Sequence, residues 1–238
     1  MKHWQQALQQ GWNIQAELTR LDGEYDLNIL AETAAAAYVL KVMRPGCDPA
    51  LIEMQISAMT HLAQHAPALP IPAILPAILP GTNGAQILTL PDEAGEGRLC
   101  WLLEKRPGHC YAQHSPKSPA LITDVGRITG QCDAALAEFT HPELRRDFKW
   151  DLMRGDWIDA HLTAIQDATR QQILRDILDE FAAIRDQLAQ LPQQAIHNDI
   201  NDYNILVTGG VEQSHHISGL IDFGDMCAAP RICNLAIA

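Results

Sequence analysis

The pattern of apolar residues changes at Pro107-Gly108, and this change constrains the fold of the chain more than any other feature. Before it, the sequence has short β-rich runs and a single segment with helical spacing. After it, long segments carry apolar residues three and four positions apart, the spacing that places them on one face of a helix. We therefore predict an α+β fold of two lobes, residues 1–104 and 105–238, which meet at residues 104–108 around a cleft.

The first lobe is predicted to be a small antiparallel β-sheet with one helix. Residues 50–64 have apolar side chains on one face of a helix, which would pack on the sheet. Residues 66–84 contain five prolines, which exclude a continuous helix and predict an extended connector. The strand-like runs are residues 25–32, 38–43, 85–90 and 98–104.

The second lobe is predicted to be mainly helical. Ser118 can cap and Pro119 can begin a helix that runs to about Phe139. A second helical block covers residues 157–191, with a break predicted near residues 166–169. Its apolar face consists of Ile173, Leu174, Ile177, Leu178, Phe181, Ile184 and Leu188. Two short strands follow, at residues 205–207 and 217–221.

The composition excludes several classes of protein. The chain has 17 Lys and Arg against 29 Asp and Glu, a net charge of −12, and no basic run, so we expect no nucleic-acid partner. No apolar run approaches the roughly 18 residues that span a bilayer, and the first residues lack the apolar stretch of a signal peptide, so we expect neither secretion nor a membrane partner. The six cysteines form no C-x-x-C pair, which favours reduced thiols in a cytoplasmic protein over disulfides or a zinc site.

The chemistry of the chain is concentrated in two motifs near its end. His197 to Asn204 has the pattern H-x-D-x-x-x-x-N, and Asp222-Phe223-Gly224 begins eighteen residues after Asn204. Phosphoryl transfer needs a carboxylate that orients the attacking hydroxyl and accepts its proton, and it needs oxygen ligands that hold Mg²⁺ against the phosphates. Asp199 can supply the first carboxylate, while Asn204 and Asp222 can supply an amide oxygen and a second carboxylate.

These motifs resemble those of the aminoglycoside-phosphotransferase-like small-molecule kinases, a branch of the protein-kinase-like superfamily that includes choline, homoserine and hydroxylysine kinases. The resemblance implies a bilobal protein-kinase-like fold that binds ATP, or alternatively GTP, together with Mg²⁺. It implies transfer of the γ-phosphoryl group to a hydroxyl of a small metabolite, with Asp199 as the base and Asn204 and Asp222 as the metal ligands. An amino alcohol or hydroxylated amino acid is the preferred acceptor class, because the acidic chain also suits a cationic substrate.

The resemblance further implies nucleotide contacts in the first lobe. Lys41, within Tyr38–Val42, would contact the phosphates, and Glu53 on the following helix would hold that lysine in place. Asn28 ends Gly23–Asn28, the segment that falls where the family has its phosphate-covering loop. Glu104 lies where the hinge between the lobes would offer backbone hydrogen bonds to adenine.

Simpler interpretations stay open for several residues. Lys41 can extend along an apolar strand to the sheet edge without any ligand, and Glu53 can be a solvated helical residue. Asp202 fits support of the metal site and a turn cap equally well. His197 is interpreted as a structural residue that holds its loop, and His215-His216 as a solvated pair and not a metal site. Core or interface positions are expected for Trp101, Trp150 and Trp157.

Three features depart from the family pattern. No G-x-G-x-x-G occurs, which leaves the looser phosphate loop of the small-molecule kinases. Asn234 stands where the family often has an aspartate that steadies the catalytic loop. The chain ends at Ala238, before the further helices of its relatives, so we expect a second lobe truncated at its C-terminus. Tyr38–Cys47 also resembles phosphotransferase domains at the N-terminus of larger aminotransferase fusions, which predicts further domains in the same polypeptide.

The alternative to a kinase is a pseudokinase, or a nucleotide- or substrate-binding module of a larger multidomain protein, without turnover. Its main support is the neutral Asn234 together with the early end of the chain. The retention of Lys41, Asp199, Asn204 and Asp222 argues against it.

Overall fold

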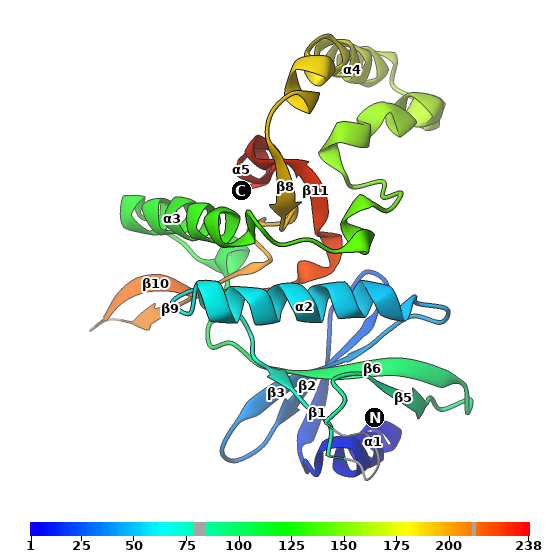
Figure 1. The fold of residues 1–238 in the computed structure, drawn as a ribbon, viewed down its shortest axis with the longest axis vertical. Coiled ribbons are helices and arrows are strands. Elements are labelled where there is room, and N and C mark those ends of the chain that lie inside the picture. The colour runs from blue at the N-terminus through cyan, green and yellow to red at the C-terminus, as the bar shows by residue number, and fades with distance from the viewer. Residues whose placement is uncertain (79–83, 211–212) are drawn as a thin grey trace.

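The computed structural model of the chain describes residues 1–78, 84–210 and 213–238. Figure 1 shows a sheet-rich half and a helix-rich half, with α2 (Pro49–His65) lying between them. The predicted bilobal α+β arrangement is therefore confirmed. The predicted connector contains the short strand β4 (Ile74–Leu75), and part of it falls outside the described residues.

The remaining elements follow in chain order. The helices are α1 (Lys2–Trp12), α3 (Pro119–Leu136), α4 (Ala168–Ala189) and α5 (Arg231–Ile237), with 3₁₀ segments η1 (Tyr111–Gln113), η2 (Pro142–Arg145), η3 (Leu152–Ala164) and η4 (Phe223–Asp225). The strands are β1 (Glu17–Leu21), β2 (Leu27–Glu32), β3 (Ala37–Val42), β5 (Leu88–Pro91), β6 (Gly97–Glu104), β7 (His109–Cys110), β8 (Gln193–Ile196), β9 (Ile205–Gly210), β10 (Gln213–Leu220) and β11 (Cys227–Pro230). The predicted strand-like runs 25–32 and 38–43 form the antiparallel pair β2–β3, with Asn28 opposite Lys41.

The first-lobe sheet runs in the order β1-β2-β3-β6-β4, and β5 also pairs with β6. Its two faces are set by the alternation of side chains along each strand. On β3, Leu40 and Val42 pack into the apolar cluster that contains α1, whereas Lys41 between them faces the other side. On β6, Cys100 belongs to the same α1 cluster, while Trp101 belongs to the larger cluster that contains α2. Helices therefore cover both faces of the sheet (Figure 1).

The prediction of one helix in the first lobe is wrong, because α1 is a second one. Its polar residues are mostly glutamine, and its buried residues recur at helical spacing, so it lies against the sheet as an amphipathic helix. The indole Nε1 of Trp12 donates a hydrogen bond to the carbonyl of Leu75 at 3.1 Å, which ties the end of α1 to β4. Asn13 ends the helix in the left-handed conformation, with φ 55°.

The helix predicted to begin at Ser118 and Pro119 is present as α3. The Ser118 hydroxyl accepts a hydrogen bond from the Leu121 N–H at 3.3 Å, as expected for an N-cap. Two small sheets complete the second lobe, in the orders β10-β9-β7 and β11-β8. They present the loop between β8 and β9 toward the first lobe.

The second helical block forms, but its apolar face is not buried. The break predicted near residues 166–169 separates η3 from α4, and Asp167 caps α4 through the N–H groups of Thr169 and Arg170. None of the residues of α4 is buried, and Ile177 is 54% exposed. The reason is that α4 packs mainly on η3 and projects from the end of the molecule (Figure 1). Within residues 1–78, 84–210 and 213–238, no helix is long and apolar enough to cross a membrane.

Candidate active site

The loop between β8 and β9 holds the first motif. The two carboxylate oxygens of Asp199 accept hydrogen bonds from the side-chain amides of Asn201 and Asn204, both at 2.6 Å. Burial raises the pKa of Asp199, the two amide hydrogen bonds lower it, and the charges of Asp222 and Glu24 raise it further. The net pKa lies above the ordinary value, which suits a carboxylate that accepts a proton.

His197 lies behind this loop and does not line the cleft. Its Nδ1 accepts a hydrogen bond from the Asp199 N–H at 3.2 Å, and its Nε2 donates to the Ile221 carbonyl at 3.2 Å. The ring is fully buried against Phe223, and burial lowers its pKa to about 4. The neutral imidazole therefore ties the first motif to the second, a geometry that suits the structural role expected for His197.

We expect the stabilising effect of His197 to depend on pH. The folded pKa of about 4 lies below the unfolded value of roughly 6.5, so the wild type loses up to about 3 kcal/mol of this contribution as the pH falls through that window. The difference in unfolding free energy between the wild type and His197→Gln should therefore narrow from pH 7 to pH 4.5, since contributions of other groups cancel. Urea unfolding of the wild type and of His197→Gln at three pH values measures this difference in unfolding free energy. A difference that stays constant would contradict the assignment.

The second motif faces Lys41 across the cleft. Asp222 has a φ of 64°, the left-handed region in which a residue other than glycine is strained. Its carboxylate lies 3.2 Å from the Lys41 Nζ, and the Lys41 charge is the main reason that the pKa of Asp222 is lowered. The backbone N–H of Ile221 donates to the Asn204 carbonyl at 3.0 Å, so the two motifs lie side by side.

These residues surround a cavity of about 540 Å³ between the lobes. One side comes from the β1–β2 loop and β3, and the other comes from residues 146–150 and the two motifs. Lys149 Nζ donates a hydrogen bond to the Tyr25 hydroxyl at 3.2 Å, which joins the two sides at the mouth. The predicted site residues that line the cavity are Asn28, Lys41, Asp199 and Asp222.

Asn204 does not line the cavity, because it lies behind Asp199. Its amide nitrogen donates to the side chain and to the backbone carbonyl of Asp199, which leaves Oδ1 as the atom that could ligate a metal. Across the described ranges, no three His, Cys, Asp or Glu side chains are arranged to hold a metal by themselves. A set of one amide oxygen and one carboxylate, completed by phosphate oxygens, is nevertheless the kind of site that Mg²⁺ takes beside a nucleotide.

Unpaired polar atoms agree with a site that receives a ligand. Four buried side-chain oxygens of the described residues lack hydrogen-bond partners, those of Gln9, Asn28, Gln55 and Asn198, and two of these residues, Asn28 and Gln55, line the cavity. Burial and the charges of Asp199 and Asp222 raise the pKa of the nearby Asp225 to about 6. A cation held by Asp222 and by phosphate oxygens would offset part of this negative charge, so the residues fit a bound Mg²⁺.

Two predicted contacts are not formed. Among the ion pairs of the described residues, Lys41 pairs with Asp222 and not with Glu53, which is exposed on α2. Glu104 does not line the cavity, and its backbone N–H already donates to the Ala73 carbonyl at 2.8 Å. The Lys41–Glu53 pair is therefore not formed in this ligand-free conformation and stays a prediction for the nucleotide-bound one. An adenine contact at Glu104 would have to use its carbonyl.

Sequence reasoning missed the residue that holds the second motif. Arg146 donates hydrogen bonds to the carbonyls of Gly224 and Met226 at 2.9 and 2.7 Å, and so fixes the backbone that follows Asp222. No motif marks such an arginine in the sequence, because its partners are carbonyls about 80 residues away. Of the three tryptophans expected at core or interface positions, Trp101 lies in the core. The side chains of Trp150 and Trp157 are exposed and pack edge to face.

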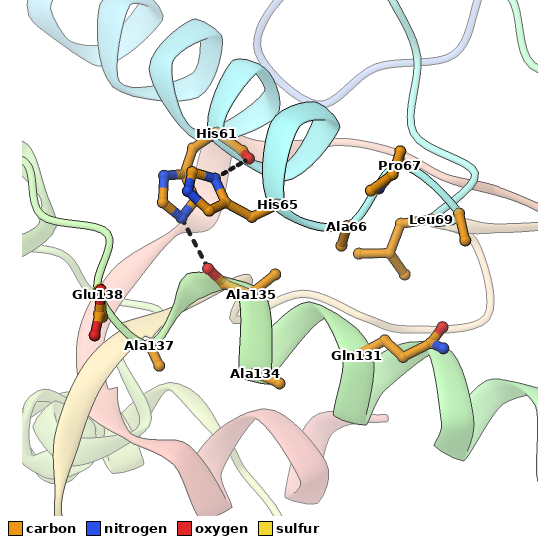
Figure 2. Close-up of a pocket in the computed structure, with 11 residues that line it drawn as sticks. His61, His65, Ala66, Pro67, Leu69, Gln131, Ala134, Ala135, Ala137 and Glu138 are labelled. Carbon is orange, nitrogen blue, oxygen red and sulfur yellow. Dashed lines mark hydrogen bonds between the residues drawn. The ribbon is translucent and has the colours of Figure 1, made fainter.

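A second cavity, also of about 540 Å³, lies between the C-terminal ends of α2 and α3 (Figure 2). The His61 Nε2 donates to the Ala135 carbonyl at 2.8 Å, and the His65 ring stacks on it with centroids 4.0 Å apart. None of the predicted site residues lines this cavity. It is a junction between two helices and lies outside the candidate active site.

Comparison with known proteins places this geometry in context. Residues 17–238 match the phosphotransferase enzyme family. The chain is 28% identical to hydroxylysine kinase of Mus musculus over 212 residues, 84% of this chain and 55% of that protein. It is also 28% identical to hydroxylysine kinase of Danio rerio over 219 residues, 87% of this chain and 59% of that protein. The chain thus spans little more than half the length of these curated relatives.

Solved structures show the same fold. A microcompartment-associated aminopropanol kinase superimposes with a TM-score of 0.74 at 23% identity, over 99% of this chain and 72% of that chain. An amicoumacin kinase in complex with AMP-PNP, Ca²⁺ and Ami gives a TM-score of 0.66 at 17% identity, over 92% of this chain and 62% of that chain. These likenesses confirm the bilobal protein-kinase-like fold that the motifs predicted.

Proposed function

Because the chain belongs to the phosphotransferase enzyme family, we propose that it transfers the γ-phosphoryl group of ATP to a hydroxyl of a small metabolite that carries an amino group. One observation carries the proposal. Asp199, with its raised pKa, and the Lys41–Asp222 pair line a single cavity between the lobes. We further propose that the lobes divide into residues 1–104 and 105–238, so that the nucleotide lies between them.

Each residue has a part in the proposed transfer. Asp199 orients the acceptor hydroxyl and accepts its proton as the oxygen attacks the γ-phosphorus. Lys41 leaves Asp222 when nucleotide binds and contacts the phosphates instead. Asn204 and Asp222 would hold Mg²⁺. When bound, this ion would neutralise part of the negative charge of the phosphates. ATP is preferred over GTP because a similar structure contains the ATP analogue AMP-PNP.

The charge of the cavity supports a cationic acceptor. Seven carboxylates line it, those of Asp22, Glu24, Asp26, Asp147, Asp199, Asp222 and Asp225. Four cationic side chains also line it, those of Lys41, Arg44, Arg146 and Lys149, so the carboxylates outnumber them. The names of the similar proteins, hydroxylysine kinase and aminopropanol kinase, point the same way. The proposed acceptor is therefore an amino alcohol or a hydroxylated amino acid.

A matched pair of acceptors tests this proposal. We expect ATP to raise the melting temperature of the chain more when Mg²⁺ is present than when it is absent, and we expect ADP release to be at least about tenfold faster with 1-amino-2-propanol than with 1,2-propanediol. The two acceptors share a hydroxyl and differ in the amine. Equal rates would contradict the cationic acceptor. Nucleotide binding with no transfer to any amino alcohol or hydroxylated amino acid would favour the binding module without turnover. Fusion to further domains stays a prediction.

A further inference from the structure

Asn234 on α5 lies beneath the loop that carries Asp199. Its Oδ1 accepts a hydrogen bond from the backbone N–H of Asn198 at 3.0 Å, and its Nδ2 donates to the Asp133 carboxylate at 2.7 Å. Asp133 belongs to α3, far from the loop in sequence. The exposed fractions of Asp133, Asn198 and Asn234 are 5%, 4% and 0%, so water does not compete for these bonds.

Asn198 is the residue whose position these bonds decide. It directly precedes Asp199, and its φ of 65° is in the left-handed region. Its side-chain amide donates to the carbonyls of Trp150 and Asp225, both at 3.1 Å. A residue held in this conformation needs several fixed contacts. The bond from its N–H to Asn234 is the one that reaches the backbone just before the proposed base.

The polarity of the three groups couples positions 133 and 234. A carboxylate only accepts hydrogen bonds and a backbone N–H only donates, so the amide of Asn234 fits between Asp133 and Asn198 in one orientation. A carboxyl at position 234 could also accept from Asn198. It would, however, place one carboxylate oxygen against another at the 2.7 Å separation of the present hydrogen bond.

We propose that Asp133 is a positioning residue that acts through Asn234 to hold Asn198 and the base that follows it. The single negative charge of the Asp133–Asn234 pair has to lie at position 133 when position 234 is asparagine. The inference rests on the proposed phosphoryl transfer for its effect on rate. Its structural part rests on the hydrogen bonds alone. The family often has an aspartate at position 234. In this chain the carboxylate of the pair is instead that of Asp133, on α3.

The titration of Asp133 agrees with this arrangement. Burial raises its pKa to about 6, while the hydrogen bond from Asn234 and the charge of Arg231 lower it. The neighbouring group from β8 is the neutral amide of Gln194, which donates to the Asp133 backbone carbonyl at 2.8 Å. A second carboxyl at position 234 would raise the Asp133 pKa further, because two buried carboxylates in contact cannot both ionise.

The test is a double-mutant cycle on the full chain. We expect Asn234→Asp alone to lower the melting temperature at pH 7.5 by about 5–10 °C and kcat by about 10²-fold, with a much smaller change in the KM for ATP. Adding Asp133→Asn should restore most of both losses, because the amide and the carboxyl have then exchanged places. The exchange rate of the Asn198 amide hydrogen, followed by NMR, should rise in Asn234→Asp and return toward the wild-type value in the double variant.

Asp124→Asn is the matched control, because Asp124 is on the same helix and its carboxylate accepts from the Ile217 N–H. This change should not rescue Asn234→Asp. Wild-type stability and Asn198 exchange in Asn234→Asp, or a double variant no better than the single one, would overturn the coupling. If no variant, including the wild type, transfers phosphate, the proposed function fails while melting temperature and exchange still decide the coupling.

Discussion

Asp199→Ala is expected to lower kcat by about 10²–10⁴-fold while leaving Mg²⁺-dependent ATP affinity nearly unchanged, since the loss is that of a general base. The carboxylate lines the cavity, and its pKa is raised by burial, so it can accept a proton from a hydroxyl there. Alanine also removes the hydrogen bonds to Asn201 and Asn204. Asp199→Asn, which keeps the shape of the side chain, should therefore be measured beside it.

Asp202→Ala is the matched control for both variants. It removes a carboxylate three residues away in the same loop, where Asp202 pairs with Lys117 at 2.6 Å and does not line the cavity. We expect kcat within a few-fold of the wild type for this variant, because the Lys117–Asp202 pair is exposed and lies outside the cavity lining. The kcat of all three variants is measured from steady-state phosphoryl transfer to the amino alcohol that the wild type uses best. A wild-type kcat in both Asp199 variants would refute the role of base.

Asp222→Asn should abolish most metal-dependent nucleotide binding. We expect the affinity for ATP in the presence of Mg²⁺ to fall by at least about 100-fold, since loss of even an outer-shell partner of a metal site weakens it by about 10–100-fold. The affinity for ATP without metal should change less. Titration calorimetry with and without Mg²⁺ separates the two effects.

Lys41→Met serves as the comparison for Asp222→Asn, because it removes the other half of the same ion pair but no proposed metal ligand. It should weaken ATP binding with and without Mg²⁺ by similar factors. The metal assignment fails if Asp222→Asn behaves in the same way as Lys41→Met, or if it binds ATP and Mg²⁺ as the wild type does.

The sequence predicted the parts of the fold that depend on local pattern. The β2–β3 pair, α2, α3 and the start of α4 all agree with the spacing of apolar residues and with capping residues such as Ser118. The helix α1 was missed although Trp4, Ala7, Leu8 and Trp12 recur at helical spacing. Its many glutamines give the segment a low mean hydropathy, and only the sheet beside it makes the apolar stripe a core face.

Burial was harder to predict than helix formation. The spacing of α4 predicts an amphipathic helix correctly, but whether its apolar face is covered depends on elements distant in sequence. Glu53 shows the same limit within the site. Ile52, Ile56 and Met59 are buried on α2, and Glu53 falls one residue out of phase with them, on the exposed face. The residues of α2 that line the cavity are Leu51 and Gln55, whose uncharged side chains gave no signal of function.

The bond between Lys41 and Asp222 has a consequence for the order of ligand binding. In the ligand-free chain these two groups satisfy each other's charge across the cleft at 3.2 Å. Nucleotide alone would take Lys41 and leave Asp222 facing the phosphates without a counter-charge, and metal alone would do the converse. Each ligand therefore relieves a penalty that the other creates, so ATP and Mg²⁺ should show positive thermodynamic coupling beyond their own complexation in solution. The empty cleft would discriminate against free nucleotide.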